Sequence, residues 1–247
     1  MASSQLLFSM HEMPMIQMFD LAAADPDVRF SPYCWRTRMA LAHKGLDVET
    51  IAWRFTDRDA LAFSGQGRVP VIRDGETVVF DSWEIARYLE RQYPDKPSLF
   101  GGPMGEAHAR FINCWADSVL NPGIIRLVLG DVYAVIAEKD RAYFHASRTE
   151  RFGAPPDQVQ AERDKTVVTF RQSLAPVCAA LGTQSFLGGE RPSYADYIVM
   201  GGFMWARNVS DFELLEAPDP IAAWRERMLD LHGRLGRNAP RASPRAR

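Results

Sequence analysis

Apolar residues in the first third of the chain predict a strand, a helix and a second strand. The strands are expected at residues 15–19 and 48–53, and residues 32–44 between them carry the pattern of a helix that ends at Gly45. Two strands separated by a helix predict a parallel pair joined by a crossover connection.

A hairpin and another helix follow. Residues 69–73 and 77–80 flank Asp74-Gly75, which is a strong signal for a tight turn between antiparallel strands. Residues 82–93 then repeat their apolar positions at helical spacing. This order of elements is the connectivity of a thioredoxin-like domain.

The remainder of the chain is helical in pattern. Two sets of apolar positions at helical spacing predict one helix each: Val167, Phe170, Leu174, Val177 and Leu181, and then Ile221, Trp224, Met228, Leu231 and Leu235. The predicted fold class is therefore an α+β thioredoxin-like N-terminal domain followed by an all-α C-terminal domain.

Proline and glycine mark the expected boundaries. A proline-rich segment places a linker at residues 95–105, between a thioredoxin-like domain at 15–94 and an all-helical domain at 106–237. We expect residues 1–14 to be a disordered extension and residues 238–247 a disordered basic tail.

Composition narrows the possible function classes. The 247 residues contain 29 Lys and Arg against 31 Asp and Glu, which gives no broad positive field for nucleic acid or an anionic membrane. The apolar stretch 119–137 is interrupted by Arg126 and Asp131, so no membrane span is expected. The three cysteines and five histidines are spaced unlike a disulfide framework or a metal site, and a cytoplasmic location is expected.

The segment Ser31-Pro32-Tyr33-Cys34, at the start of the first predicted helix, is the main candidate for chemistry. Exposed N–H groups and the helix dipole at such a position favour a thiolate and lower the pKa of a thiol from its free value of ~8.5. Serine cannot form a mixed disulfide, but its hydroxyl can donate a hydrogen bond to a ligand's thiolate. The same residues also fit an ordinary helix start, with serine as the cap and proline as the first residue.

Four segments resemble the glutathione S-transferase family over about residues 15–237. They are Ser31-Pro32-Tyr33-Cys34-Trp35-Arg36, Ser64-Gly65-Gln66-Gly67-Arg68-Val69-Pro70, Asp81-Ser82-Trp83-Glu84-Ile85-Ala86 and Ser193-Tyr194-Ala195-Asp196. The resemblance implies a serine-type member with a thioredoxin-like domain for glutathione and a helical domain for a hydrophobic co-substrate. For the fourth segment we favour a structural interpretation, in which Asp196 caps and anchors a helix.

The resemblance implies three places of contact with glutathione. Ser31 would activate the thiol, and Val69, followed by a cis bond to Pro70, would pair with the cysteinyl backbone as a short strand does. Asp81 and Ser82 would hold the ammonium and the carboxylate of the γ-glutamyl end at a helix N-terminus. The alternatives are an edge strand at Val69 and a plain helix cap at Asp81-Ser82.

Two further sets of contacts follow from the resemblance. The glycine carboxylate of glutathione needs a cation, for which the available residues are Lys44, Arg54 and Arg68. Candidates for an aromatic wall around the co-substrate are Tyr33, Trp115, Tyr133 and Trp205, although tryptophans at helical spacing are more often part of a core.

The bacterial β-etherase-like branch and its fungal-type relatives are the closest in pattern, also through Ala42-His43-Lys44-Gly45 and Ser147-Arg148-Thr149-Glu150-Arg151-Phe152-Gly153. This similarity implies binding of aromatic compounds, a homodimer and, in etherases, cleavage of β-aryl ethers by glutathione. Two other function classes stay open: a noncatalytic module that binds glutathione or hydrophobic ligands, and a thiol oxidoreductase that uses Cys34 or glutathione itself.

Overall fold

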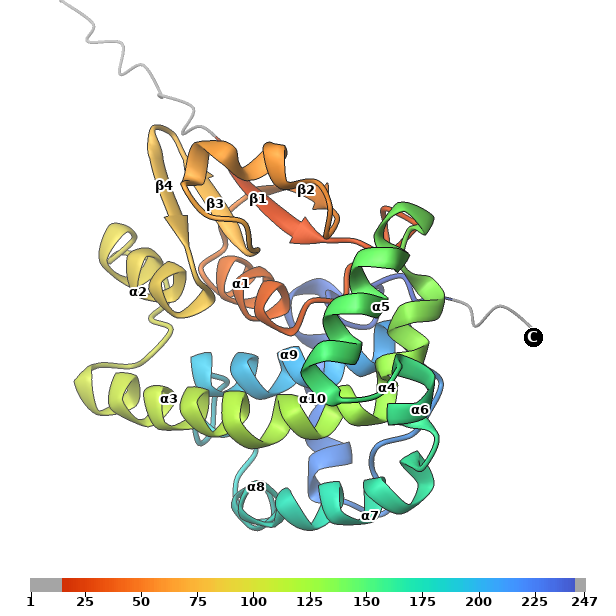
Figure 1. Ribbon diagram of the computed structural model, residues 1–247. Helices are drawn as coiled ribbons and strands as arrows, with labels where there is room; N and C mark the ends of the chain where they lie inside the picture. The colour runs from red at the N-terminus through yellow and green to blue at the C-terminus, as the bar shows by residue number, and fades with distance from the viewer. Residues whose placement is uncertain (1–14, 243–247) are drawn as a thin grey trace, which may run out of the picture.

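Short apolar runs form a four-stranded sheet in the computed structural model, which describes residues 15–242 (Figure 1). The strands are β1 (Ile16–Leu21), β2 (Val48–Trp53), β3 (Val71–Asp74) and β4 (Thr77–Phe80), in the spatial order β2-β1-β3-β4. β1 is parallel to β2 and antiparallel to β3, and β3 and β4 form a hairpin. The helix α1 (Pro32–His43) supplies the crossover that the parallel pair needs, which confirms the thioredoxin-like arrangement.

Two other helices complete the mixed domain. α2 (Ser82–Gln92) follows the hairpin as predicted, whereas the short helix η1 (Arg58–Ser64) between β2 and β3 was not predicted. η1 is a 3₁₀ helix with about three residues per turn, so a search for the α-helical period does not detect it.

The second domain contains helices alone among its main elements, as predicted, and lies below and to the right of the sheet in Figure 1. Its helices are α3 (Pro103–Trp115), α4 (Asn121–Val135), α5 (Glu138–Phe152), α6 (Pro156–Gln160), α7 (Arg163–Ser173), α8 (Ala175–Leu181), α9 (Tyr194–Val209) and α10 (Pro220–Arg234). α2 ends at Gln92 and α3 begins at Pro103, inside the segment 95–105 that was expected to be a linker.

A widened π turn, Ala116–Leu120, joins α3 to α4 without a break. Its cause is Pro122, which has no N–H to donate and whose ring would clash with the carbonyl of Ser118, four residues earlier, in a regular α-helix. The N–H of Asn121 instead donates to the carbonyl of Ala116, five residues back. Such π turns often occur at functional sites, and this one places Asp117 at a cavity described below.

The helix predicted through Val167 and Leu181 is in fact two helices. α7 ends at Ser173 and α8 begins at Ala175, with Leu174 between them. Pro176 lies in the first turn of α8, where its missing N–H costs nothing, and this favours a new helix over continuation of the old one. Apolar spacing alone does not register the break, because the same side of both segments is buried.

The tail was predicted to begin at residue 238, but residues 238–242 pack against the helical domain. The N–H of Ala242 donates to the carbonyl of Asn208 at 2.9 Å, and Arg241 forms an ion pair with Asp211 at 2.7 Å. Backbone acceptors on α9 therefore extend the ordered domain beyond the predicted boundary. The predicted disorder of residues 1–14 and 243–247 lies outside the described residues.

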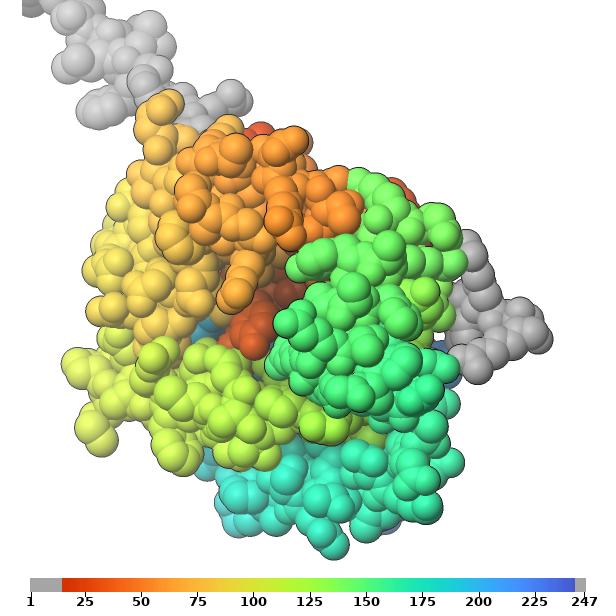
Figure 2. Space-filling model, viewed as in Figure 1, coloured from red at the N-terminus to blue at the C-terminus, as the bar shows by residue number. Residues whose placement is uncertain are grey.

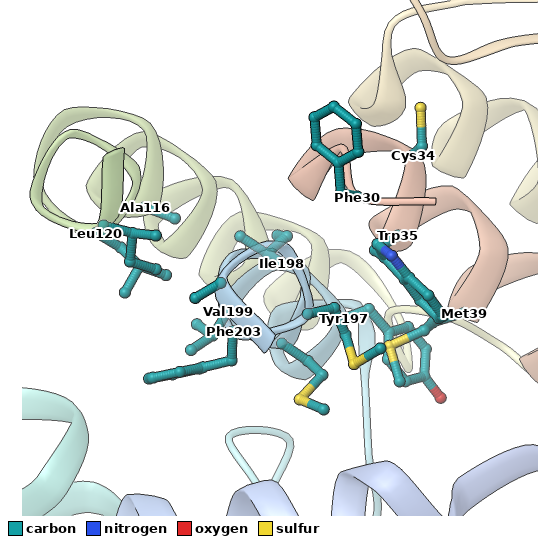
Figure 3. Packing of buried hydrophobic residues seen from close by; sticks show 14 of the residues in the cluster. Phe30, Cys34, Trp35, Met39, Ala116, Leu120, Tyr197, Ile198, Val199 and Phe203 are labelled. Carbon is teal, nitrogen blue, oxygen red and sulfur yellow. The ribbon is translucent and has the colours of Figure 1, made fainter. Parts of the chain in front are cut away.

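The two domains share one core through α1 and α9. Figure 3 shows Trp35 and Met39 of α1 directed toward Tyr197 of α9, whereas Cys34 points to the opposite side of α1. The indole N–H of Trp35 and the amide of Asn208 both donate to the carbonyl of Arg29, each at 2.8 Å. This packing fixes the start of α1 relative to the helical domain.

Among residues 15–242, one continuous helix, Pro103–Val135, is long and apolar enough by length and composition to cross a membrane. Half of its most apolar window is buried inside the fold. Core helices of globular domains commonly have this property, so the observation is weak evidence for a span.

A chain of three polar side chains also crosses the domain boundary. Nε2 of His43 lies 3.0 Å from the carbonyl of Ser98, so it carries the proton, and Nδ1 accepts from the hydroxyl of Tyr197 at 2.6 Å. The same hydroxyl oxygen then accepts from Nε2 of His232 at 3.0 Å. Burial, together with the repulsion that arises when His43 is also protonated, lowers the pKa of His232 from 6.5 to about 4.

The stability of the protein is expected to fall as the pH drops from about 6.5 toward 4, because the unfolded chain binds a proton that folded His232 does not accept. Above pH 6.5 the histidine is neutral in both states and this contribution is complete. His232→Asn removes the titration and suits the positive φ of 52° at this position. Urea unfolding of both proteins across this range should show the weaker pH dependence in the variant, and equal pH dependence would contradict the assignment.

Candidate functional site

Ser31 begins the polar part of the site at the first turn of α1. Its backbone is extended, and its Oγ accepts a hydrogen bond from the N–H of Cys34 at 3.3 Å. Capping uses only a lone pair of the oxygen, so the hydroxyl hydrogen can still be donated to another acceptor. The helix-cap interpretation and the thiol-binding interpretation are therefore compatible with one geometry.

A cavity of about 660 Å³ opens at Ser31 between the domains. Figure 2 shows a hollow whose floor is the red to dark-orange start of the chain, flanked by orange segments of the mixed domain and by the green helix α5. Ser31, Tyr33 and Val69 line the cavity from the mixed domain, while the helical domain contributes residues of α4 and α5 and Trp205 of α9.

Val69 presents its backbone at the wall of this cavity. The bond from Val69 to Pro70 is cis, as the resemblance implied. In the described sheet, the pairing of β3 with both neighbours begins at Val71, so the N–H and C=O of Val69 take no part in either ladder. These groups are placed for an extended ligand to pair with them.

A second cavity of about 410 Å³ lies at the N-terminus of α2 and shares Tyr33 with the first. Asp81 and Ser82 line it from α2, and Arg110 lines it from α3. The carboxylate of Asp81 accepts hydrogen bonds from the N–H groups of the two residues after Ser82, at 2.9 and 3.2 Å. Asp81 therefore caps α2, as the alternative interpretation of this segment expects. Its backbone has a φ of 71°, which aspartate tolerates better than most residues.

An ion pair between a buried guanidinium and a solvent-accessible carboxylate lies at the junction of the two cavities. Arg36 of α1 donates to Asp117 at 2.8 Å and to Asn113 at 3.0 Å, and its guanidinium lies 4.7 Å from the ring centre of Tyr33. Asp117, in the π turn, lines both cavities. The pair connects α1 to the helical domain and neutralises the carboxylate.

Comparison with known families covers both halves of the chain. The family described as Glutathione S-transferase, N-terminal domain, matches residues 30–92, and that described as Glutathione S-transferase, C-terminal domain, matches residues 107–228. Glutathione S-transferase 4 of Zea mays is 30% identical over 205 residues, which cover 78% of this chain and 82% of that protein. The chain belongs to the glutathione S-transferase family.

Solved structures of the same family have the same fold. A glutathione transferase of Phanerochaete chrysosporium superposes with a TM-score of 0.79 at 24% identity, covering 87% of this chain and 96% of its own. A glutathione S-transferase of Ceriporiopsis subvermispora, crystallised in complex with glutathione, also gives a TM-score of 0.79 at 24% identity, covering 92% of this chain and 100% of its own. At this level of identity the likeness concerns the fold.

Within this glutathione S-transferase fold, two predicted cations line neither cavity. Lys44 follows the C-terminal end of α1, roughly 18 Å along the helix axis from Ser31, so it lies far from the cavity at the other end. Its side chain is fully buried and forms an ion pair with Glu90 at 2.7 Å. Arg54 donates to the backbone carbonyls of Ala23 and Ala24, both at 3.2 Å. Lys44 and Arg54 therefore lie away from both cavities in which a glycine carboxylate would be bound, whereas Arg68 lines the larger one.

The four residues predicted to form an aromatic wall lie in two different environments. Tyr33 and Trp205 line the larger cavity, and the buried indole N–H of Trp205 has no acceptor among residues 15–242. Trp115 and Tyr133 line neither cavity and pack against the core instead, with the ring of Tyr133 6.3 Å from that of Phe144. Helical spacing identifies a buried face, but it does not say whether that face meets a cavity or the core.

Several residues of the cavity were not predicted. They are Leu21, Phe30, Trp53, Phe55, Arg58, Asn121, Pro122, Ile125, Val132, Tyr143, Phe144, Arg148 and Arg151. The segment 147–153, which carries the branch resemblance, includes two of them and was the one available signal. Phe55 and Phe144 come from different domains, with ring centres 5.5 Å apart, and only the tertiary fold brings them together.

Cys34 does not face the cavity. Its side chain is fully buried, and burial, reinforced by the charge of Asp20, raises the pKa of the thiol well above its ordinary value. A reactive thiol needs access and a lowered pKa, and this cysteine has neither. The structure thus disfavours a disulfide exchange that depends on Cys34.

Proposed function

We propose that the protein is a glutathione transferase that activates the thiol of glutathione at Ser31. The single observation that carries the proposal is the convergence of Ser31, the free backbone of Val69 and the N-terminus of α2 around two adjoining cavities. A family member crystallised with glutathione has the same fold, which supports the choice of ligand.

In this proposal glutathione lies extended across the two cavities. Its γ-glutamyl carboxylate is held at the N-terminus of α2 by Ser82 and the backbone, and the second oxygen of Asp81 accepts from the ammonium group. The cysteinyl unit pairs with the backbone of Val69, which directs the thiol to Ser31. Arg68 takes the place of Lys44 and Arg54 as the cation proposed for the glycine carboxylate.

The activated thiolate would attack an electrophilic carbon of an aromatic co-substrate. Support comes from the rings that line the larger cavity beside Ser31: Phe30, Tyr33, Trp53, Phe55, Tyr143, Phe144 and Trp205. Cleavage of a β-aryl ether, the reaction implied by the sequence resemblance, is the narrower form of the proposal. In that reaction a carbon–sulfur bond forms, the carbon–oxygen bond breaks, and the aryl oxygen leaves with the bonding electrons as a phenolate, which takes a proton from water.

A homodimer belongs to the same proposal. Two large apolar side chains of α3, Met104 and Phe111, are 86% and 69% exposed, and Phe80 of β4 is also exposed. Contiguous exposed apolar surface commonly marks a contact site, and Met104 and Phe111 lie two turns apart on the same side of α3. A second copy of the chain is the partner we propose for this face.

The ultraviolet thiolate absorbance of bound glutathione across pH tests the proposal. In the wild type the bound thiol should titrate about one to two pKa units below ~8.5, because a hydrogen bond to a charged group contributes ~1.5 to 3 kcal/mol. In Ser31→Ala the thiol pKa should return toward the free value. Ser31→Thr, which keeps a hydroxyl and a helix cap, should retain part of the shift, and Ser173→Ala on α7 should retain all of it.

The outcomes separate the function classes. Glutathione that binds with an unshifted thiol pKa, and no turnover of aromatic electrophiles, would favour the noncatalytic binding module. Reduction of a mixed disulfide by glutathione at a higher rate than aromatic conjugation would favour the oxidoreductase. A wild-type shift that survives in Ser31→Ala would move the activating role from Ser31 to the backbone N–H groups of α1.

A further inference from the structure

The larger cavity carries more positive charge than its own carboxylates can balance. Arg58, Arg68, Arg148 and Arg151 line it, and in the described part of the chain none of the four forms an ion pair. The one carboxylate of the lining, Asp117, is already paired with the guanidinium of Arg36.

Arg148 is the most enclosed of these four groups. Its guanidinium carbon lies 4.7 Å from the ring centre of Phe144 and 5.7 Å from that of Phe55, so aromatic rings of both domains lie against it. Within residues 15–242 the hydrogen-bond acceptor of the guanidinium is the hydroxyl of Ser147 at 3.1 Å. Burial lowers the pKa of Arg148, as expected for a cation withdrawn from water without a counter-charge.

Arg151 adds to the imbalance. It follows Arg148 by one helical turn on α5 and lines the same cavity. Like charges at this spacing repel each other and disfavour the helix. The two arginines lie beside an aromatic surface. An anion bound between the rings and Arg148 would reduce the repulsion between the two guanidinium groups and would give Arg148 the ion-pair partner that it lacks.

We infer that the cavity selects aromatic electrophiles that carry a carboxylate, with the ring against Phe55 and Phe144 and the carboxylate on the guanidinium of Arg148. This inference rests on the proposed glutathione transferase function and adds the substrate class. Arg68, beside Val69, stays assigned to the glycine carboxylate of glutathione. Arg148 lies across the cavity on α5 and is the group assigned to the co-substrate.

A chlorodinitrobenzoate with chlorine para to the carboxyl group, and its neutral methyl ester, form a matched pair of probes. The glutathione thiolate forms a carbon–sulfur bond at the carbon that bears chlorine, the carbon–chlorine bond breaks, and chloride leaves with the bonding electrons. For each probe, kcat/KM is divided by the rate constant of its uncatalysed reaction with glutathione at the same pH, which removes the difference in intrinsic reactivity. The ratio of the acid's value to the ester's value then measures recognition of the carboxylate.

The wild type should favour the acid by roughly tenfold or more, the discrimination expected from a charge-assisted hydrogen bond away from bulk water. Arg148→Met keeps a long side chain against the rings and should remove most of that preference, while Arg148→Lys should keep part of it. Arg126→Met deletes a guanidinium that lies over Phe152 outside the cavity and should leave the ratio unchanged.

Binding of unreactive analogues separates this inference from the proposed function. Calorimetry with dinitrobenzoate and its methyl ester, which lack the leaving group, measures the preference without any reaction. Turnover of the ester with equal binding of the two analogues would overturn the carboxylate inference and leave the transferase function standing. Preferential binding of the acid that Arg148→Met abolishes, without turnover of either probe, would support the inference and contradict the transferase function. A preference that survives in Arg148→Met would show that Arg148 serves only to pack the rings.

Discussion

Asp196→Ala is expected to lower the free energy of unfolding by ~3 to 5 kcal/mol, because it leaves several buried donors without an acceptor. Asp196 is fully buried at the start of α9. One carboxylate oxygen accepts from the N–H of Leu187 at 2.7 Å and from the indole of Trp224 at 2.9 Å. The other accepts from the N–H groups of Gly188 and Ser193, at 3.0 and 2.9 Å.

Denaturant unfolding of matched variants tests this role. Asp196→Asn keeps one oxygen but presents an amide donor to N–H groups, so its loss should be smaller than that of the alanine variant and still large. Asp47→Ala, at an exposed loop position, should stay within about 0.5 kcal/mol of the wild type. An alanine variant at 196 as stable as the one at 47 would show that water can satisfy these donors.

The sequence predicts the cap at Asp196 and two of the strand pairings for the same reason, which is that all of these features depend on local spacing. A serine three residues before an acid specifies a capping box, and Asp74-Gly75 between apolar runs specifies a hairpin. The crossover helix 32–44 then makes the parallel pair the simplest topology. Each of these signals lies within a single element or between consecutive elements, so it does not depend on tertiary contacts.

The sequence identified residues that line the cavities only where those residues stand at the start of a helix or next to a strand. Ser31, Val69 and Ser82 stand at a helix start, before a strand and at a second helix start, and the fold brings all three to the cavities. Lys44 was misplaced, because nothing in the sequence shows that its charge is buried against Glu90. The sequence did not identify Arg148 as lining the cavity, because the rings against its guanidinium belong to two domains.

The contact between α1 and α9 depends on a glycine that the sequence does not single out. A β-carbon at Gly201 would lie 2.3 Å from the carbonyl oxygen of Pro32 and 3.2 Å from Cγ of Arg36. The first contact is with backbone, so no side-chain rotation can relieve it, and α1 would have to move away from α9. Pro32 is next to Ser31, so this movement displaces the group proposed to hold the thiol.

Gly201→Ala should therefore impair catalysis without touching any ligand. A displacement of ~1 Å at reacting groups can cost about a hundredfold in rate, and overpacking of a core typically costs ~1 to 3 kcal/mol of stability. We expect kcat/KM for glutathione conjugation to fall by about that factor and the thiol pKa of bound glutathione to rise toward ~8.5. Kinetics and thiolate absorbance of the purified variant measure both effects.

Two neighbouring substitutions distinguish a displaced α1 from a general effect of alanine. At Gly202 the nearest atoms to a β-carbon belong to side chains of the helical domain, the closest being Cδ1 of Ile124 at 3.0 Å, so Gly202→Ala should cost some stability but leave the thiol pKa unchanged. At Gly182, where the nearest atoms lie at 3.4 Å, the same change should alter neither quantity appreciably. If Gly201→Ala matched Gly182→Ala in thiol pKa and in kcat/KM, the position of Ser31 would not depend on the close approach of α9 to α1.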